Sequence, residues 1–367
     1  MSTIPLVDLA AQHATVGAEI EAELARLMRS TAFILGEPVE RFEKEFAAFS
    51  GAGHCVGVAN GTDALELAFR ALGIGPGDDV LVPANTFAAT ALAVARAGAR
   101  PVFVDCDDRY QLVDVGSART RVTPNTKAIV PVHLFGQMAP MADVNDIAKS
   151  LDLHVVEDAA QAHGARQNDA PPGATTPAAT YSFYPSKNLG AYGDAGAVTI
   201  NDPAIAEALR ALRNYGSDTK YEHPVAGFNS RLDTLQAAVL SIKLKHLAGW
   251  NEQRRAAAAR YDEMLADLEV RVPETAPGNI HVWHLYVVRA ARRDEVLTSL
   301  QDQGIGAGIH YPKPLHLQGA FASLGHSPGD FPVAERVASE ILSLPLYPEI
   351  TPEQQERVVD ALRKAIG

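Results

Sequence analysis

The stretch SFYPSKNLG, residues 182–190, decides the interpretation of this chain, together with VVEDAAQ, residues 155–161. Each stretch begins as a short apolar strand and then reaches a charged residue, Lys187 in the first and Asp158 in the second. The residues around Lys187 are unusually poor in charge, and desolvation there would lower the pKa of its amine. Asp158 precedes a nearly uncharged run, so its carboxylate should be partly buried and in need of a cationic partner. We interpret the two residues as a chemical pair.

Outward from this pair, short apolar strands alternate with helices. We expect strands at 54–58, 79–82, 101–104, 127–133 and 154–156, and helices at 15–30, 38–50, 63–72, 87–97 and 141–150. Apolar strands separated by helices predict a large, mostly parallel sheet covered on both faces, hence an α/β fold. Strands near 180–183 and 195–200 follow one another without a full-length helix, which places Lys187 in the connection between them. Ligands of such sheets bind beyond the carboxyl ends of the strands.

The length of 367 residues favours two domains. A helical region at 232–268 should carry the chain out of the large domain, which with the N-terminal segment covers 1–245. A smaller α/β domain is expected over 246–367, with a strand at 283–289 and helices at 294–303 and 352–366.

The bulk composition excludes several classes of function. A net charge of −12 argues against nucleic-acid partners, which need a basic face. Cys55 and Cys106 lie in apolar, strand-like surroundings and should be small core residues. The sequence contains no CxxC motif, and no metal site is predicted. Residues 1–5 lack the features of a signal peptide, and no apolar run suggests a membrane span. We therefore expect a cytoplasmic protein.

The pair of Lys187 and Asp158 matches the needs of pyridoxal 5′-phosphate (PLP). This cofactor uses a lysine amine for its Schiff base and a carboxylate that keeps the ring nitrogen protonated. Gly61 and Thr62 begin a predicted helix whose N–H groups and hydroxyl suit a phosphate, although Thr62 or Asp63 would serve equally as an ordinary cap.

Three further side chains complete this predicted site. Ser182 offers a second hydroxyl to the phosphate, or merely belongs to a strand. Gln161 is placed to donate to the phenolic oxygen of the ring. Phe87 would stack on the pyridine face or be a core aromatic, and the sequence does not favour either reading.

Six spaced motifs resemble the PLP-dependent sugar aminotransferases of the DegT/DnrJ/StrS family, from about Ile4 to the C-terminus. They are Gly61-Thr62, Phe87, EDAAQ at 157–161, SFYPSKN at 182–188, GDAGA at 193–197 and GFNSRL at 227–232. The resemblance implies a type I (aspartate aminotransferase-like) PLP fold and a homodimer with shared active sites. Asn229 would reach the PLP phosphate of the neighbouring subunit, and residues 31–36 would approach the neighbour's sugar nucleotide. Ala195 replaces a common glycine, and residues 109–123 match the family poorly.

Within the family, GIHYPKPLH at 308–316 and QAHG at 161–164 look like members that aminate a 3-keto group of a nucleotide-linked (dTDP-linked) deoxysugar. By that similarity Tyr184, His310 and Tyr311 lie near the sugar, whereas a histidine before Pro312 also suits a turn. Arg231 would hold the pyrophosphate or the donor carboxylate, or form an ion pair at a helix start.

The resulting hypothesis is a ping-pong transamination. Glutamate or glutamine gives its amino group to the cofactor, pyridoxamine phosphate is the intermediate form, and Lys187 moves the proton. The alternatives are amination of a C4-keto nucleotide sugar or of a keto-inositol. A dehydratase of the same fold would carry a histidine in place of Lys187. A noncatalytic PLP-binding regulator would more often lack the lysine or carry an added DNA-binding module.

Overall fold

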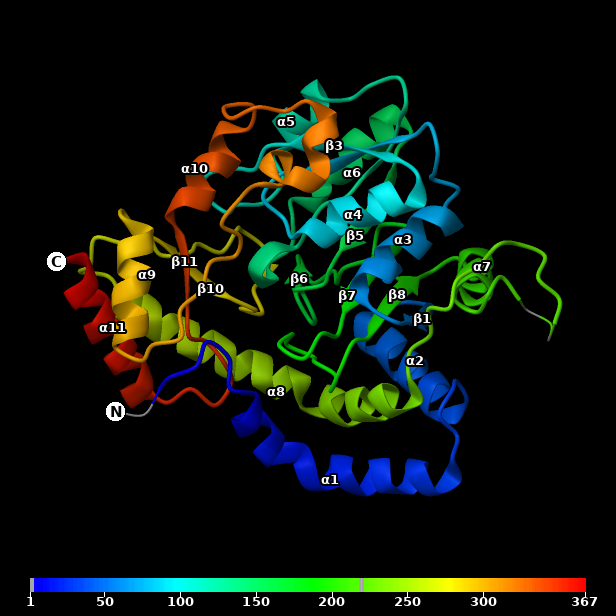
Figure 1. The fold of residues 1–367 in the computed structure, drawn as a ribbon, viewed down its shortest axis with the longest axis horizontal. Coiled ribbons are helices and arrows are strands. Elements are labelled where there is room, and N and C mark those ends of the chain that lie inside the picture. The colour runs from blue at the N-terminus through cyan, green and yellow to red at the C-terminus, as the bar shows by residue number, and fades with distance from the viewer. Residues whose placement is uncertain (1–2, 218, 220) are drawn as a thin grey trace.

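A seven-stranded sheet forms the centre of the molecule in the computed structural model, which describes residues 3–217, 219 and 221–367 (Figure 1). The expectation that residues 1–5 do not form a signal peptide falls partly on Met1 and Ser2, which lie outside the described residues. Across the sheet the strands run in the order β1 (His54–Val58), β8 (Gly196–Ile200), β7 (Ala178–Ser182), β5 (His154–Asp158), β4 (Thr126–Ile129), β2 (Asp79–Pro83) and β3 (Arg100–Val104).

The sheet is mostly parallel, as predicted. Strand β8 is antiparallel to both of its neighbours, β1 and β7, and the other pairs are parallel. Strands β1, β7, β5 and β2 therefore end at the same edge. Lys187 lies in the loop from β7 to β8, and Asp158 is the last residue of β5. The two predicted functional residues thus meet at the carboxyl edge, where α/β sheets bind their ligands.

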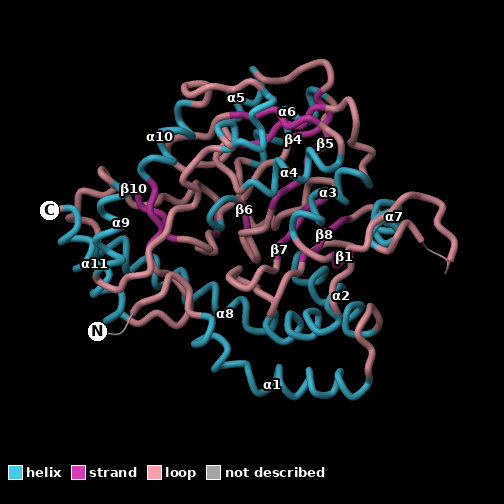
Figure 2. The backbone as a smooth tube through the Cα atoms, in the orientation of Figure 1, coloured by secondary structure: helices cyan, strands magenta, loops and turns pink. Residues whose placement is uncertain are grey.

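Helices cover both faces of the sheet (Figure 2). On one face the apolar cluster combines strand residues with α3 (Gly61–Ala71), α4 (Ala88–Ala97) and α7 (Pro203–Arg213). On the other face it combines them with α2 (Glu37–Ser50), α5 (Val115–Thr120), α6 (Met141–Leu151) and part of α8 (Thr234–Met264). Strands buried on both faces explain why their sequences are apolar without alternation.

A further apolar cluster lies in the C-terminal part of the chain. Its elements are the last turns of α8, the strand pair β10 (Tyr286–Arg289) and β11 (Ile341–Leu344), and the helices α9 (Arg293–Asp302) and α11 (Pro352–Ile366). Ile4 also packs in this cluster and pairs with Ile305. The domain boundary near residue 245, which falls inside α8, stays a prediction. The remaining named elements are α10 (Pro332–Glu340), the short strands β6 (Arg166–Gln167) and β9 (Asn279–Ile280), and 3-10 helices at 134–136, 315–317 and 319–324.

The N-terminal helix differs from its prediction in length and in one contact. Helix α1 (Leu9–Ser30) begins six residues earlier than expected, because Asp8 caps it by accepting from the Ala11 N–H at 2.9 Å. It packs on α8 through Val16 and Ile20. Helical spacing in the sequence predicts that Met28 shares a face with Ile20, but the side chain of Met28 is 56% exposed.

Other differences have local causes. Strand β4 ends at Ile129, ahead of Pro131, whose nitrogen has no hydrogen to donate. The sequence interpretation did not include α5, α7, α10 or β11. Cys55 and Cys106 are buried, as expected of core residues.

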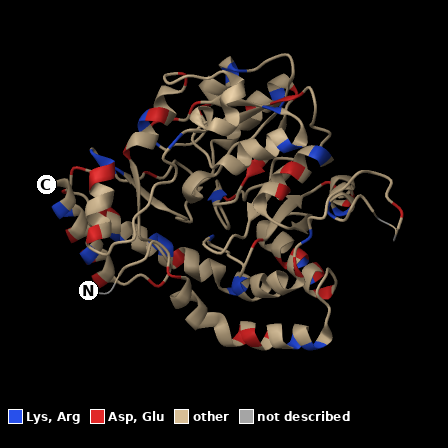
Figure 3. Cartoon of the chain, viewed as in Figure 1, with Lys and Arg blue, Asp and Glu red and all other residues tan. Residues whose placement is uncertain are grey.

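Acidic and basic residues are mixed on the outer helices α1 and α11 (Figure 3). The absence of nucleic-acid partners stays a prediction from the net charge of −12. Within the described residues no helix is both long and apolar enough to cross a membrane.

Phe46 of α2 joins that helix to the strand that leads to Lys187. Its ring packs edge-on against two aromatic rings, with centroid distances of 5.2 Å to Phe183 and 4.9 Å to Tyr181. The side chain of Phe46 is fully buried. We predict that Phe46→Ala lowers the free energy of unfolding by about 3–5 kcal/mol, because it leaves a cavity under β7. Leu151→Ala, at a side chain that is 42% exposed, should cost far less in the same denaturant titration. Equal losses would contradict this packing.

Candidate active site

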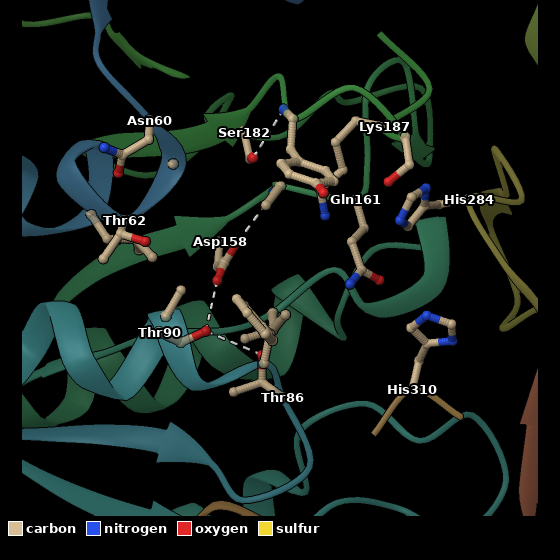
Figure 4. Close-up of a pocket in the computed structure, with 18 of the residues that line it drawn as sticks. Asn60, Thr62, Thr86, Thr90, Asp158, Gln161, Ser182, Lys187, His284 and His310 are labelled. Atoms are coloured by element: carbon tan, nitrogen blue, oxygen red, sulfur yellow. Dashed lines mark hydrogen bonds between the residues drawn. The ribbon is translucent and has the colours of Figure 1, made fainter. Parts of the chain in front are cut away.

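A cavity of about 580 Å³ opens at the carboxyl edge of the sheet (Figure 4). Most of the predicted site residues line it, namely Gly61, Thr62, Phe87, Asp158, Gln161, Ser182, Tyr184, Lys187, His310 and Tyr311. They come from loops and helix starts after β1, β2, β5 and β7, and from the C-terminal part. Asn229 and Arg231 are not among the residues that line it.

Asp158 is held in place through both carboxylate oxygens. Thr90 Oγ1 donates to Oδ2 at 2.8 Å, and the Ala160 N–H donates to Oδ1 at 3.1 Å. Since Thr90 has one hydroxyl proton and gives it to the carboxylate, the 3.1 Å contact with Thr86 is a bond that Thr86 donates. The side chain of Asp158 is 6% exposed. This series of hydrogen bonds therefore holds a buried carboxylate in a fixed position beside the cavity.

Lys187 lies opposite this acid on a tight turn. The backbone N–H of Lys187 donates to the Tyr184 carbonyl at 2.8 Å, and the backbone N–H of Ala191 donates to the Phe183 carbonyl at 2.8 Å. Burial lowers the pKa of the amine to about 8, against the opposing effect of the Asp158 charge, which raises it. With a pKa of about 8, part of the Lys187 population carries a neutral, nucleophilic amine at physiological pH.

The start of α3 forms one end of the cavity. The N-cap is Asn60, whose side chain accepts from the Asp63 N–H at 2.9 Å, so the alternative of a cap by Thr62 or Asp63 is wrong. Gly61 is required here, because a Cβ at this position would fall 2.6 Å from Ser182 Cβ. The N–H groups of Gly61 and Thr62 are left for a ligand, as at other helix starts that bind anions.

Aromatic residues form the opposite wall. Phe87 is 54% exposed and is therefore not a core residue, and its ring centroid lies 5.3 Å from that of Tyr311. Gln161 accepts from the Phe135 N–H at 2.6 Å and donates to the Tyr311 hydroxyl at 3.1 Å. Burial, followed by the charge of Asp158, raises the pKa of Tyr311. The Gln161 amide was expected to donate to the phenolic oxygen of the cofactor ring. In this structure it donates to the Tyr311 hydroxyl.

His310 and Tyr184 also line the cavity. Nδ1 of His310 is 2.8 Å from Ser343 Oγ, and burial lowers the pKa of the imidazole to about 4. The histidine is therefore neutral at physiological pH. Tyr184 is 56% exposed.

Asn229 and Arg231 lie away from the cavity in this single chain. The backbone of Asn229 pairs with that of Asn214, and its side chain is exposed. Arg231 donates to Asn214 Oδ1 at 3.2 Å, with its guanidinium 5.6 Å from the centre of the Tyr215 ring. The guanidinium of Arg231 thus contacts an amide oxygen and the face of an aromatic ring.

Several lining residues were not identified from the sequence, among them Thr86, Thr90 and His284. The spacing of the two threonines by four residues at the start of a helix was a signal, because such residues share a face. His284 gave no comparable signal, since it stands in an apolar run before β10.

The residues present fit PLP, the predicted cofactor. The cavity holds an amine for imine formation, a fixed carboxylate for the ring nitrogen, and free N–H groups with the Ser182 hydroxyl for a phosphate.

Comparison with known proteins agrees with this chemistry. The sequence model of the DegT/DnrJ/EryC1/StrS aminotransferase family matches residues 14–363. A pleiotropic regulatory protein of Geobacillus stearothermophilus is 50% identical over 98% of this chain and 97% of its own length. The dTDP-3-amino-3,4,6-trideoxy-alpha-D-glucose transaminase of Streptomyces venezuelae is 48% identical over 98% of this chain and 96% of its own.

A solved structure is similarly close. The crystal structure of S. venezuelae DesV in complex with a ketimine intermediate has a TM-score of 0.97 to this chain at 47% sequence identity. The match covers 99% of this chain and 98% of that one.

The lowered pKa of Lys187 predicts its reactivity in the cofactor-free protein. Acylation, followed by peptide mass spectrometry, should rise with pH through a midpoint of about 8, where a lysine in a free peptide reaches about 10.4. Asp158→Asn should move the midpoint of Lys187 lower still, because the carboxylate charge raises this pKa. A midpoint near that of the free peptide would contradict the burial of the amine.

Proposed function

The chain belongs to the DegT/DnrJ/EryC1/StrS aminotransferase family, and from this premise we propose that it aminates the C3 keto group of a nucleotide-linked deoxysugar. It is a PLP-dependent aminotransferase. The observation that carries the proposal is the meeting of Lys187, Asp158 and the start of α3 in one cavity. The transaminase of S. venezuelae, 48% identical, supports a dTDP-linked sugar as acceptor. Glutamate or glutamine is the proposed donor.

Each residue has a proposed task. Bound PLP supplies an electron-withdrawing ring that stabilises negative charge on the carbon that exchanges its proton. Lys187 takes and returns that proton, for which a pKa of about 8 is well matched. Asp158 holds the proton of the ring nitrogen, and Thr90 keeps this carboxylate in place.

The remaining cavity residues would bind the ligands. We assign the phosphate to Gly61, Thr62 and Ser182, and stacking on the ring to Phe87. Tyr184, His310 and Tyr311 would contact the sugar, and Gln161 orients Tyr311 through their 3.1 Å bond. Neutral His310 is suited to a hydroxyl group rather than to a phosphate.

We also propose a homodimer with shared active sites. Residues 31–36, which the family resemblance assigns to the neighbour's site, carry exposed large side chains in the single chain, with Phe33 at 43% and Ile34 at 58%. The outward position of Asn229, away from its own cavity, supports a role in the partner's site. The proposed compartment is the cytoplasm, where buried, unpaired cysteines such as Cys55 and Cys106 are ordinary.

A regulatory role is the second candidate, because a relative at 50% identity is named a pleiotropic regulatory protein. Lys187 in a cavity with Asp158 favours turnover, since simple cofactor binding does not require a lysine with a lowered pKa.

Removal of the Lys187 amine tests the catalytic assignment. Lys187→Ala should lower turnover by about 10⁴-fold or more, since proton transfer and imine formation both depend on this amine. Lys44→Ala, at an exposed lysine of α2, is the control and should keep full activity. Substantial turnover by Lys187→Ala would refute the role of Lys187.

The acceptor is identified by direct assay. Wild-type enzyme with PLP and glutamate should convert a 3-keto nucleotide sugar to the amino sugar, detected by mass spectrometry, in preference to 4-keto nucleotide sugars and keto-inositols. Product from the keto-inositol alone would contradict the proposed acceptor. Turnover of none of these acceptors would favour the regulatory candidate.

Mixed dimers test the shared site. If Asn229 serves the partner's cavity, inactive Lys187→Ala and impaired Asn229→Ala subunits should together form one intact site in each heterodimer. Random exchange would then restore about a quarter of wild-type activity. Lys187→Ala mixed with Asp158→Ala should restore none, because both residues belong to the same chain's site. No restoration in the first mixture would mean that Asn229 acts within its own subunit.

A further inference from the structure

His284 is a cavity residue with no role in the function proposed above. It lies immediately before β10 and lines the same cavity as Lys187 (Figure 4). Its side chain is nearly buried, at 6% exposure. Its position therefore depends on the hydrogen bonds that fix the ring.

The neighbour of Lys187 determines which ring nitrogen carries the proton. Asn188 Nδ2 donates both of its hydrogens, one to Asn251 Oδ1 at 2.9 Å and one to the Val282 carbonyl at 2.8 Å. Asn188 Oδ1 can then only accept, so the 3.2 Å contact with His284 Nδ1 is donated by the imidazole. Asn251 is fixed in turn, because its Nδ2 donates to the His163 carbonyl at 2.8 Å.

The other ring nitrogen, Nε2, therefore carries a lone pair. Burial lowers the pKa of His284 well below its ordinary value, and the charges of Lys187 and Arg254, followed by His310 and His163, lower it further. The ring is neutral at physiological pH. Among the described residues no group donates a hydrogen bond to Nε2, which leaves this lone pair to the cavity that His284 lines.

The amine of Lys187 is the donor that this acceptor lacks. Asp158 acts on this amine through its charge, and among the described residues no side chain is hydrogen-bonded to Nζ of Lys187. When Lys187 is not bonded to the cofactor, its ammonium needs an acceptor that is still available.

We propose that His284 is a positioning residue for Lys187, whose protonated amine donates a hydrogen bond to Nε2 whenever it is free of the cofactor. The proton stays on Nζ, and no covalent bond changes. The inference rests on the proposed role of Lys187 as the catalytic lysine. Asn188, next to Lys187 in the sequence, keeps the imidazole in the tautomer that accepts.

The test is the ionisation of Lys187 in cofactor-free enzyme, measured by pH-dependent acylation and peptide mass spectrometry. His284→Phe removes the acceptor, so the ammonium should become less stable and the proton affinity of Lys187 should fall about tenfold. His284→Gln, a neutral acceptor, should restore part of it. The pH profile of kcat should shift in the same direction, with KM for the sugar little changed.

His163→Phe is the matched control. His163 is also buried and also feels the charge of Lys187, yet it does not line the cavity, so its replacement should leave the Lys187 midpoint unchanged. Should His284→Phe fail to fold, as judged by circular dichroism, His284→Ala serves instead. An unchanged midpoint, an equal fall in His163→Phe, or a change in KM alone would overturn the proposal. The acylation readout needs neither cofactor nor sugar, so a wrong assignment of the acceptor does not affect it. The catalytic role of Lys187 is tested separately, by the turnover of Lys187→Ala.

Discussion

The charge of one buried carboxylate, that of Asp158, organises the cavity. Its oxygens are fixed by the Thr90 hydroxyl and the Ala160 N–H, so the charge has a defined position without a salt bridge. That charge raises the pKa of Lys187 and of Tyr311, in the first case against the desolvation of the amine. An acid held in this way is prepared for a cationic ring nitrogen. The structure therefore contains the electrostatic partner of the cofactor before the cofactor arrives.

The neighbouring carboxylate, Glu157, anchors the strand that carries Asp158. Successive side chains of a strand point to opposite faces, so Glu157 lies beneath the sheet when Asp158 faces the ligand. The Ala139 N–H donates to His133 Nδ1, so the ring's Nε2–H donates to Glu157 at 2.7 Å. The Gly173 N–H adds a bond of 2.9 Å. Glu157 of this pair is bonded within the fold, and Asp158 lines the cavity.

The sequence predicted the features that depend on local pattern. The strands around 54–58, 154–158 and 178–182 follow from apolar runs, and the position of Lys187 and Asp158 at one edge follows from their parallel arrangement. Contacts between distant segments were not predictable in this way. The Thr90–Asp158 bond joins residues 68 apart, and His284 reaches the site from the C-terminal part. The place of Asn229 in a partner's site stays a prediction, because a single chain does not contain that contact.

The central claim is that Lys187, and no other lysine, bonds to PLP. Lys243 is the informative rival, because burial lowers its pKa to about 8 as well. Its amine is held by Gln12 Oε1 at 2.9 Å and the Gly190 carbonyl at 2.8 Å, so its position serves the fold. Borohydride reduction of the PLP-loaded enzyme, followed by peptide mass spectrometry, tests this directly. The account predicts one pyridoxyl group on Lys187, and a pyridoxyl group on Lys243 or on any other lysine would contradict it.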